Sequence, residues 1–203
     1  MEYRKIMHNQ PQYRMGFTLI ELMVTIAIAG ILLGVAIPSF ISTIASNRLT
    51  ANANELVTAL NLARSEAVKR GASVTVRKVD SNSFTNLSST ANWENGWDVF
   101  TDADSDGNYE TGDILIRTFG ALNASYTLRG NTYIANFIRY QADGSINLAG
   151  NFVICNNDSI TGAKLIITNA VGRVRIASDA DHDGIPEKDA TTEISSCTVT
   201  TGF

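Results

Sequence analysis

An apolar run near the N-terminus limits the possible folds of this chain more than any other segment. It extends from Phe17 to Ile37, reads FTLIELMVTIAIAGILLGVAI, and holds one charged residue, Glu21, among its 21 residues. About 20 apolar residues are enough to cross the hydrocarbon core of a bilayer as a helix. Arg4, Lys5 and Arg14 precede the run, and basic flanks stay on the cytoplasmic side. The sequence therefore predicts a single-pass membrane protein whose C-terminal part is exported.

The remaining length and charge narrow the functional classes. After the first 16 residues and the apolar run, the 203-residue chain has room for one globular domain. Residues 1–16 hold three of the 16 basic and one of the 20 acidic residues, so the rest has 13 basic and 19 acidic residues, a net charge of −6. Phosphate contacts require positive charge, so nucleic acid could bind only at a local basic patch. The histidines are His8, before the run, and His182, in an acidic segment, and no Gly-rich phosphate loop is present, so we predict a non-enzyme.

The start of the apolar run carries a processing motif. Gly16 to Glu21 (GFTLIE) resembles the processing site of type IV prepilins and type II secretion pseudopilins. A conventional signal peptide is cleaved after a shorter apolar core, whereas here the glycine precedes the run. The resemblance implies that a prepilin peptidase removes residues 1–16 as a leader, cuts between Gly16 and Phe17, and methylates the new N-terminus. It also implies a bacterial inner-membrane protein with its head in the periplasm, which later packs against other pilins in a pilus.

Glu21 is the one charge in the apolar run, and a carboxylate in hydrocarbon requires a partner. After cleavage, the amino group of Phe17 lies one helical turn away, and the resemblance suggests the same group on a neighbouring subunit. Either pairing favours assembly. The alternative is a carboxylate near a helix end that reaches water.

A second helical segment follows the membrane segment. Pro38 is expected to break or kink the first helix, because proline removes one hydrogen bond and clashes with the preceding turn. From Ser39 to Arg70 an apolar stripe recurs every three or four residues, at Ile41, Ala45, Leu49, Ala53, Leu56, Leu60, Ala63 and Ala67. Gly71 is expected to cap this helix. We therefore expect a leader at 1–16, a transmembrane helix at 17–38, an amphipathic helix at 39–70 and a head at 71–203.

The head has the pattern of a β-rich domain. After Gly71 the apolar period changes to two, and short runs separated by Gly, Asn, Asp and Ser predict strands. The predicted strands are 74–77, 97–100, 114–119, 126–129, 133–140, 145–148, 152–155, 164–168 and 173–176. The predicted fold class is α+β, a long N-terminal pilin helix packed on an antiparallel β-sheet head.

Two head segments narrow the resemblance. Residues 55–71 (ELVTALNLARSEAVKRG) and 93–102 (WENGWDVFTD) look like the GspH/FimT family of minor pilins and minor pseudopilins. This resemblance implies a minor pilin that takes part in the assembly and function of a type IV pilus. The alternative, a minor pseudopilin of a type II secretion system, has the same N-terminal features, so both stay open.

A basic tetrapeptide lies near the C-terminus. Gly172 to Arg175 (GRVR) is similar to the GRxR motif of FimT-type minor pilins that bind DNA during natural transformation. In a strand, Arg173 and Arg175 point to the same face, and two guanidinium groups can hold phosphates. The prediction is sequence-independent DNA binding, and the alternative is a strand with two solvated arginines.

Calcium is the one cofactor that the sequence suggests. Residues 102–113 (DADSDGNYETGD) have the spacing of a twelve-residue calcium loop, with glycine sixth. The candidate ligands are Asp102, Asp104, Asp106 and the closing Asp113. Predicted strands flank this loop where an EF-hand has helices. A second run, 179–184 (DADHDG), starts with the same spacing but has Ala190 at its closing position. Ordinary Asp and Gly turns are the alternative for both.

The two cysteines, Cys155 and Cys197, lie in the exported part. An even count in an exported domain favours one disulfide, worth about 4 kcal/mol in the chain-entropy treatment. Two buried free thiols are the alternative.

Overall fold

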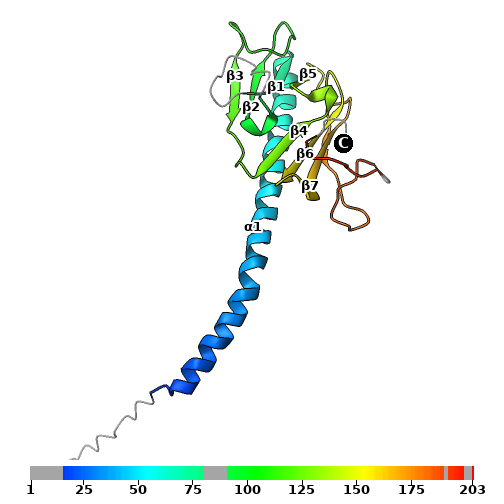
Figure 1. Cartoon of the computed structure of the whole chain (residues 1–203). Helices are drawn as coiled ribbons and strands as arrows, with labels where there is room; N and C mark the ends of the chain where they lie inside the picture. Colours follow the sequence, from blue (N-terminus) through cyan, green and yellow to red (C-terminus); the bar gives the residue numbers. More distant parts are fainter. Residues whose placement is uncertain (1–15, 80–90, 190–191, 199–202) are drawn as a thin grey trace, which may run out of the picture. The chain divides into compact units, whose positions relative to one another are not determined.

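A computed structural model describes residues 16–79, 91–189, 192–198 and 203. The chain divides into two compact units, with the boundary between Thr43 and Ile44. Helix α1, Leu19–Arg70, begins in the first unit and ends in the second (Figure 1). Every strand belongs to the second unit, the head.

The first unit consists, in its described part, of the start of α1. The Thr18 hydroxyl oxygen accepts a hydrogen bond from the Glu21 main-chain N–H at 3.2 Å, which satisfies one donor at the helix start. Between Leu19 and Thr43 no residue is buried, although most are apolar. Pro38 lies inside α1, so of the two expected outcomes the break does not occur, because the helix continues on both sides of the lost hydrogen bond; a kink stays a prediction.

The second half of α1 has a buried stripe. The buried residues are Leu49, Ala53, Leu56, Ala59, Leu60, Ala63 and Ala67, which confirms the predicted stripe from Leu49 onward and adds Ala59. The helix ends as predicted at Gly71, whose φ of 63° lies in the left-handed region. Beyond it, the Ala72 N–H donates to the Ala67 carbonyl oxygen at 3.3 Å.

The head is antiparallel β-sheet, as predicted, and its strands form two four-stranded sheets. The first has the order β3-β2-β1-β5, built from β1 Val74–Lys78, β2 Trp97–Thr101, β3 Leu115–Phe119 and β5 Phe137–Tyr140. The second has the order β4-β6-β7-β8, built from β4 Tyr126–Gly130, β6 Gly150–Asn156, β7 Ser159–Thr168 and β8 Val174–Ile176. The division arises because β4 pairs with β6 instead of with its neighbours in sequence.

Two predicted strands differ from the structure. The segment predicted at 133–140 begins as the 3₁₀-helix η2, Thr132–Ile134, and only Phe137–Tyr140 is a strand. The segment predicted at 145–148 forms only one isolated bridge, between Tyr140 and Ile146, because the preceding residues turn at Gly144 with φ of 81°. A second 3₁₀-helix, η1 Trp93–Asn95, precedes β2.

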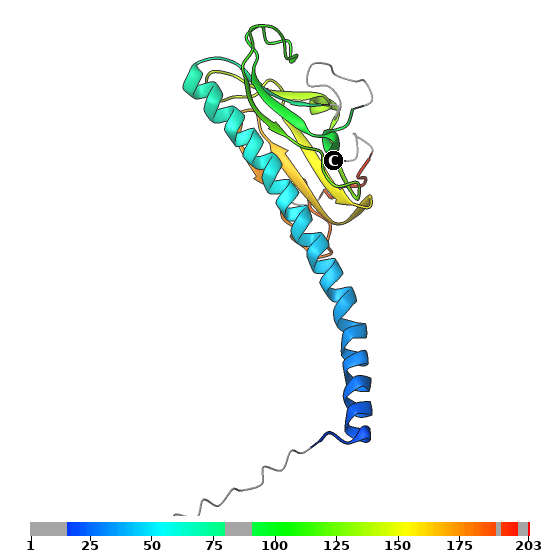
Figure 2. The ribbon, with the colours of Figure 1, turned by 90° about the vertical axis from the view of Figure 1, so that its left-hand side faces the viewer.

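The main core lies between the helical stripe and one face of each sheet, as Figure 2 shows for the second half of α1. Trp93, Trp97 and Phe152 are among its largest side chains. A second apolar cluster, which includes Val153, Leu165 and Ile194, covers the other face of the second sheet. The C-terminal segment therefore packs on the face of the second sheet that the main core leaves uncovered.

Candidate assembly, basic and acidic sites

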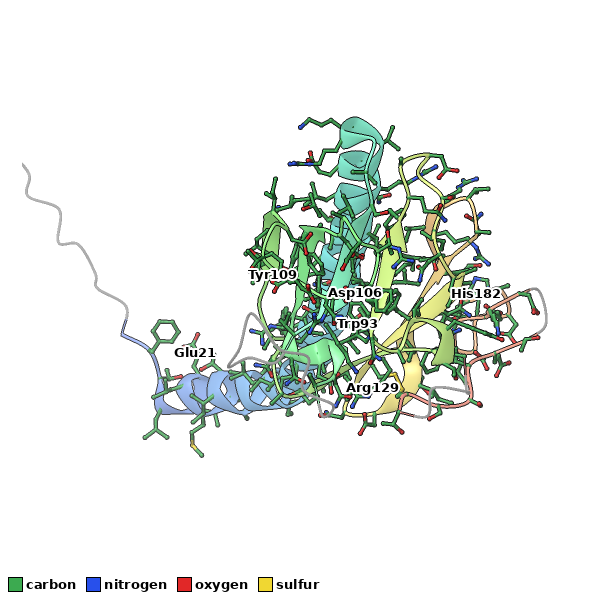
Figure 3. The ribbon with its side chains drawn as sticks, turned by 90° about the horizontal axis from the view of Figure 1, so that it is seen from above. Glu21, Trp93, Asp106, Tyr109, Arg129 and His182 are labelled. Atoms are coloured by element: carbon green, nitrogen blue, oxygen red, sulfur yellow. A yellow bond between two sulfur atoms is a disulfide. The ribbon has the colours of Figure 1, made fainter. Side chains whose placement is uncertain are left out.

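The predicted processing site lies at the start of the described chain. Phe17 is 80% exposed, and Glu21, labelled in Figure 3, lies in the first turn of α1. In the described residues no basic side chain forms an ion pair with Glu21. The described residues therefore supply no basic side chain as a partner for this carboxylate, and its pairing with an amino group stays a prediction. The cleavage itself stays a prediction.

Arg173 and Arg175 lie at the outer edge of the second sheet, beside and within β8, and both are exposed. Val174 between them packs against the main core, so the two arginines share the opposite face. The Arg175 guanidinium donates to the Lys188 carbonyl oxygen at 3.1 Å. Lys188 is exposed and its main chain lies beside the Arg175 guanidinium, so we group these three exposed basic residues as the basic patch. Sequence reasoning missed it because this loop contact joins residues 13 positions apart.

Two other arginines of the head are engaged elsewhere. Arg129 forms an ion pair with Glu94. Arg139 lies 3.8 Å from the carboxylate of Asp102 in the first sheet region. Neither therefore adds its charge to the patch of Arg173, Arg175 and Lys188.

Gly172 of the basic tetrapeptide has a packing role. Its φ is 75°, and a Cβ there would lie 2.0 Å from the Gly144 carbonyl oxygen. Arg64 of α1 connects the same two turns by donating hydrogen bonds to the carbonyl oxygens of Gly144 (3.2 Å) and Val171 (3.1 Å). The turn that positions Arg173 is thus tied to the second half of α1.

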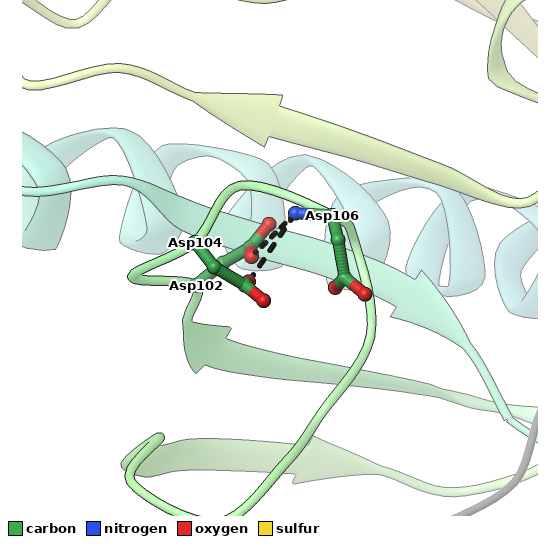
Figure 4. A group of neighbouring side chains, drawn as sticks. All are labelled: Asp102, Asp104 and Asp106. Atoms are coloured by element: carbon green, nitrogen blue, oxygen red, sulfur yellow. Dashed lines mark hydrogen bonds between the residues drawn. The ribbon is translucent and has the colours of Figure 1, made fainter.

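The first acidic loop follows β2. Carboxylate oxygens of Asp102, Asp104 and Asp106 lie within 4.8 Å of one another (Figure 4). Asp113, predicted to close a calcium site, is not part of this group; its carboxylate accepts hydrogen bonds from the main-chain N–H groups of Glu110 (3.0 Å) and Ala103 (3.4 Å). The structure therefore brings together three of the four predicted ligands, and calcium binding there stays a prediction.

Two arginines lie beside the carboxylates of this loop. Arg139 faces Asp102, and the buried Arg77 donates a hydrogen bond to the Asn108 side-chain oxygen at 3.5 Å. Hydrogen bonds from Asn108, and then the charges of Arg77 and Arg139, lower the pKa of Asp106. These contacts favour the ionised form of the Asp106 carboxylate.

The second acidic run lies in the loop after β8. Carboxylate oxygens of Asp179, Asp181 and Asp183 also lie within 4.8 Å of one another. His182, labelled in Figure 3, is exposed within this loop. The loop leads to Glu187, which is buried, and to Glu193 near the C-terminus.

Cys155 and Cys197 form the predicted disulfide, with their Cα atoms 6.0 Å apart and the two residues 42 positions apart in sequence. Cys155 is in the middle of the second sheet, on β6. Both cysteines are buried in the second apolar cluster. The disulfide therefore fixes the C-terminal segment to the second sheet.

An apolar N-terminal helix with a single carboxylate, followed by a β-rich head packed on the second half of that helix, defines a protein of the type IV pilin class. The prokaryotic N-terminal methylation motif matches residues 16–37. The family described as type II transport protein GspH matches residues 52–172, more than half of the chain. The chain belongs to this family, whose members are structural subunits.

Solved structures agree with this fold. Two crystal structures of the type IV minor pilin FimU from Pseudomonas aeruginosa strain PAO1 resemble the chain. One is 21% identical with a TM-score of 0.52 and covers 74% of this chain and 96% of its own. The other is 19% identical with a TM-score of 0.51, covering 73% and 98%. None of the curated proteins compared with the chain matches it.

Proposed function

We propose that this protein is a minor pilin of a type IV pilus, present in few copies and helping to start or decorate the fibre. The observation that carries the proposal is the first half of α1, where no residue is buried and Glu21 has no ion-pair partner among the described residues. Such a surface requires lipid before assembly and other subunits after it. The head of the same molecule provides neither the lipid nor the neighbouring subunit that this surface requires.

The proposed mechanism begins with processing. Prepilin peptidase cuts between Gly16 and Phe17 on the cytoplasmic face and methylates the new amino group. The apolar helix keeps the protein in the inner membrane with its head in the periplasm. During assembly, the Glu21 carboxylate pairs with the amino group of a neighbouring subunit. A charge that is unpaired in hydrocarbon is costly, so this pairing favours one register between subunits.

The alternative role is a minor pseudopilin of a type II secretion system. The likeness to FimU, a type IV minor pilin, supports the pilus role, whereas the description of the family as a type II transport protein supports the alternative. The N-terminal half suits either machine. A deletion strain distinguishes them: we expect fewer pili with normal secretion of exported enzymes. Loss of secretion with unchanged piliation would favour the pseudopilin role.

We propose, second, that the patch of Arg173, Arg175 and Lys188 binds DNA without sequence preference, as a receptor during DNA uptake. The observation that favours this role is that the fold adds a third exposed cation to the two arginines of the motif. Three phosphate contacts predict weak binding, with a slope of about −3 for the logarithm of affinity against the logarithm of salt concentration.

The test is a titration of duplex DNA with the purified mature protein in detergent. Arg173→Ala with Arg175→Ala is expected to abolish binding at low salt. The matched control, Arg48→Ala with Arg117→Ala, removes two exposed arginines elsewhere and is expected to bind like the unaltered protein. Equal binding by the two double variants would remove the DNA role and leave the minor-pilin proposal intact.

A further inference from the structure

Two turns of the head meet beside the second half of α1. One, residues 141–145, follows β5 of the first sheet, and the other, residues 169–172, lies between β7 and β8 of the second sheet. The Ile146 N–H, just after the first turn, donates to the Ala170 carbonyl oxygen of the second turn at 3.1 Å. This main-chain contact connects the two sheets, whose described strands do not pair with each other.

The second turn fixes the main chain of Arg173. The Arg173 N–H donates to the Asn169 side-chain oxygen at 2.9 Å, and the Arg173 carbonyl oxygen accepts a hydrogen bond from the Asn169 N–H at 3.1 Å. Arg175 is instead held within β8, where it pairs with Ile167 of β7. A displaced turn would therefore move the Arg173 guanidinium relative to that of Arg175.

Arg64 of α1 holds both turns. Its Nε–H donates to the Gly144 carbonyl oxygen at 3.2 Å, and its Nη2 donates to the Val171 carbonyl oxygen at 3.1 Å. Arg64 is half-buried, and it forms no ion pair with a carboxylate of the described residues. Hydrogen bonds from a charged donor are stronger than neutral ones, and a planar guanidinium presents several donors at fixed angles. One arginine can therefore bridge the two turns.

Close packing leaves no space for a side chain between the turns and α1. Gly172 has a φ of 75°, and a Cβ there would clash with the Gly144 carbonyl oxygen and lie 3.1 Å from the ring of the fully buried Tyr140. A Cβ at Gly144 would lie 3.1 Å from Val68 and 3.2 Å from Arg64. A change at Arg64 is therefore expected to shift the turn that carries Arg173.

We propose that Arg64 positions Arg173 for contact with DNA and does not touch the DNA itself. The inference rests on the proposed DNA-binding role of the basic patch. Val174 packs against the main core, which contains the stripe of α1, so Arg173 and Arg175 point away from that core. Arg64 therefore acts on the basic patch through the turn. A contact residue that is already in place loses less freedom on binding, which increases affinity.

The direct test is the titration of duplex DNA at low salt with the purified mature protein in detergent. Arg64→Ala is expected to lower the affinity about three- to tenfold, and by no more than Arg173→Ala does. Arg48→Ala removes an exposed arginine of the same helix and should leave the affinity unchanged. Equal affinities of the Arg64→Ala protein and the unaltered protein would overturn the proposal.

A double-mutant cycle separates positioning from direct contact. If Arg64 acts through Arg173, Arg64→Ala has no further effect on the affinity of the Arg173→Ala protein. A residue that contacts a phosphate itself contributes about one unit to the salt slope. A further loss of affinity in the double variant, with a further decrease of this slope, would show that Arg64 contacts DNA and would refute the positioning role.

Arg64→Lys separates the bridge from the charge. Lysine keeps the positive charge, but its single ammonium group lacks the spaced donors of a guanidinium. We therefore expect the Arg64→Lys protein to bind DNA as weakly as the Arg64→Ala protein. Full affinity in the lysine variant would mean that only the charge matters and would also refute the bridge.

Hydrogen exchange measured by mass spectrometry tests the turn without DNA. In Arg64→Ala, the amides of residues 169–173 should exchange faster than in the unaltered and Arg48→Ala proteins, while unchanged exchange in β6 shows that the head is folded. Unchanged exchange in the turn would overturn the positioning role even if the protein binds DNA. Faster exchange in the turn, together with no DNA binding by the unaltered protein, would refute the DNA role and still show that Arg64 holds the turn.

Discussion

The two halves of α1 belong to one helix and have different surroundings. From Leu19 to Thr43 the helix is apolar, and no residue is buried within the protein. From Ile44 to Arg70 it has polar faces, and seven of its residues are buried against the head. The second half finds its apolar partner within the chain, while the first must find one in lipid or in other subunits. We therefore expect the second half of α1 to contribute to the folding stability of the head and the first half to contribute to assembly.

The largest expected effect separates these two roles at Glu21. We expect Glu21→Gln, which keeps the shape of the side chain and removes its charge, to abolish incorporation into pili. The reason is loss of the ion pair with the amino group of a neighbour. Immunoblots of sheared fibres and membranes should show protein of mature size in the membrane only. A variant found in fibres at normal level would show that Glu21 is a solvated carboxylate.

A smaller effect is expected from a matched pair of leucines. Leu56 is fully buried and Leu33 is 57% exposed. Leu56→Ala should lower the free energy of unfolding of the head by about 2–5 kcal/mol, because it removes core contacts and leaves a cavity. Leu33→Ala should leave it unchanged.

The fluorescence of Trp93 and Trp97, which are buried in the head, reports its unfolding in denaturant. Equal losses in the two leucine variants would mean that both halves of α1 contribute to the stability of the head. No loss in either would mean that the head folds without the helical stripe.

The smallest effect concerns the exposed end of the second half. Glu66 forms ion pairs with Arg70 (2.7 Å) and Lys69 (3.1 Å), and Arg70 in particular lowers its pKa below the ordinary 4.5. The ionised Glu66 carboxylate therefore makes its full contribution to the free energy of unfolding above pH 4.5. This contribution disappears as the pH falls through the lowered pKa. Glu66→Gln should unfold at slightly lower denaturant than the unaltered protein at pH 7, and the two should converge in acid. A difference that grows in acid would contradict the assignment.

The sequence predicts the features that depend on neighbouring residues. The apolar run, the stripe from Leu49 to Ala67 and the strands β1 and β2 follow from local periodicity, and each appears in the structure, although all five residues of β1 are buried rather than alternate ones. The division into two sheets does not follow from local periodicity, because it depends on the pairing of β4 with β6 across more than 20 residues. Pro38 does not end the first helix, because a helix can continue when only one of its hydrogen bonds is lost.

In the candidate sites too, the sequence predicts what depends on neighbouring residues and misses what depends on contacts between distant ones. Arg173 and Arg175 stand two positions apart, and strand geometry places them on one face. Lys188 joins them through a loop contact that no local pattern contains. Asp113 has the spacing of a ligand, but its carboxylate accepts hydrogen bonds from the main chain of its own loop instead.

The central claim is that the exposed half of α1 enters a pilus after cleavage at Gly16. Mass spectrometry of sheared, purified pili tests it most directly. The account predicts an N-terminal peptide that begins with methylated Phe17, present in the fibres at low abundance relative to the major subunit. Protein of mature size that stays in the membrane and never appears in fibres, or a peptide that still carries residues 1–16, would contradict it.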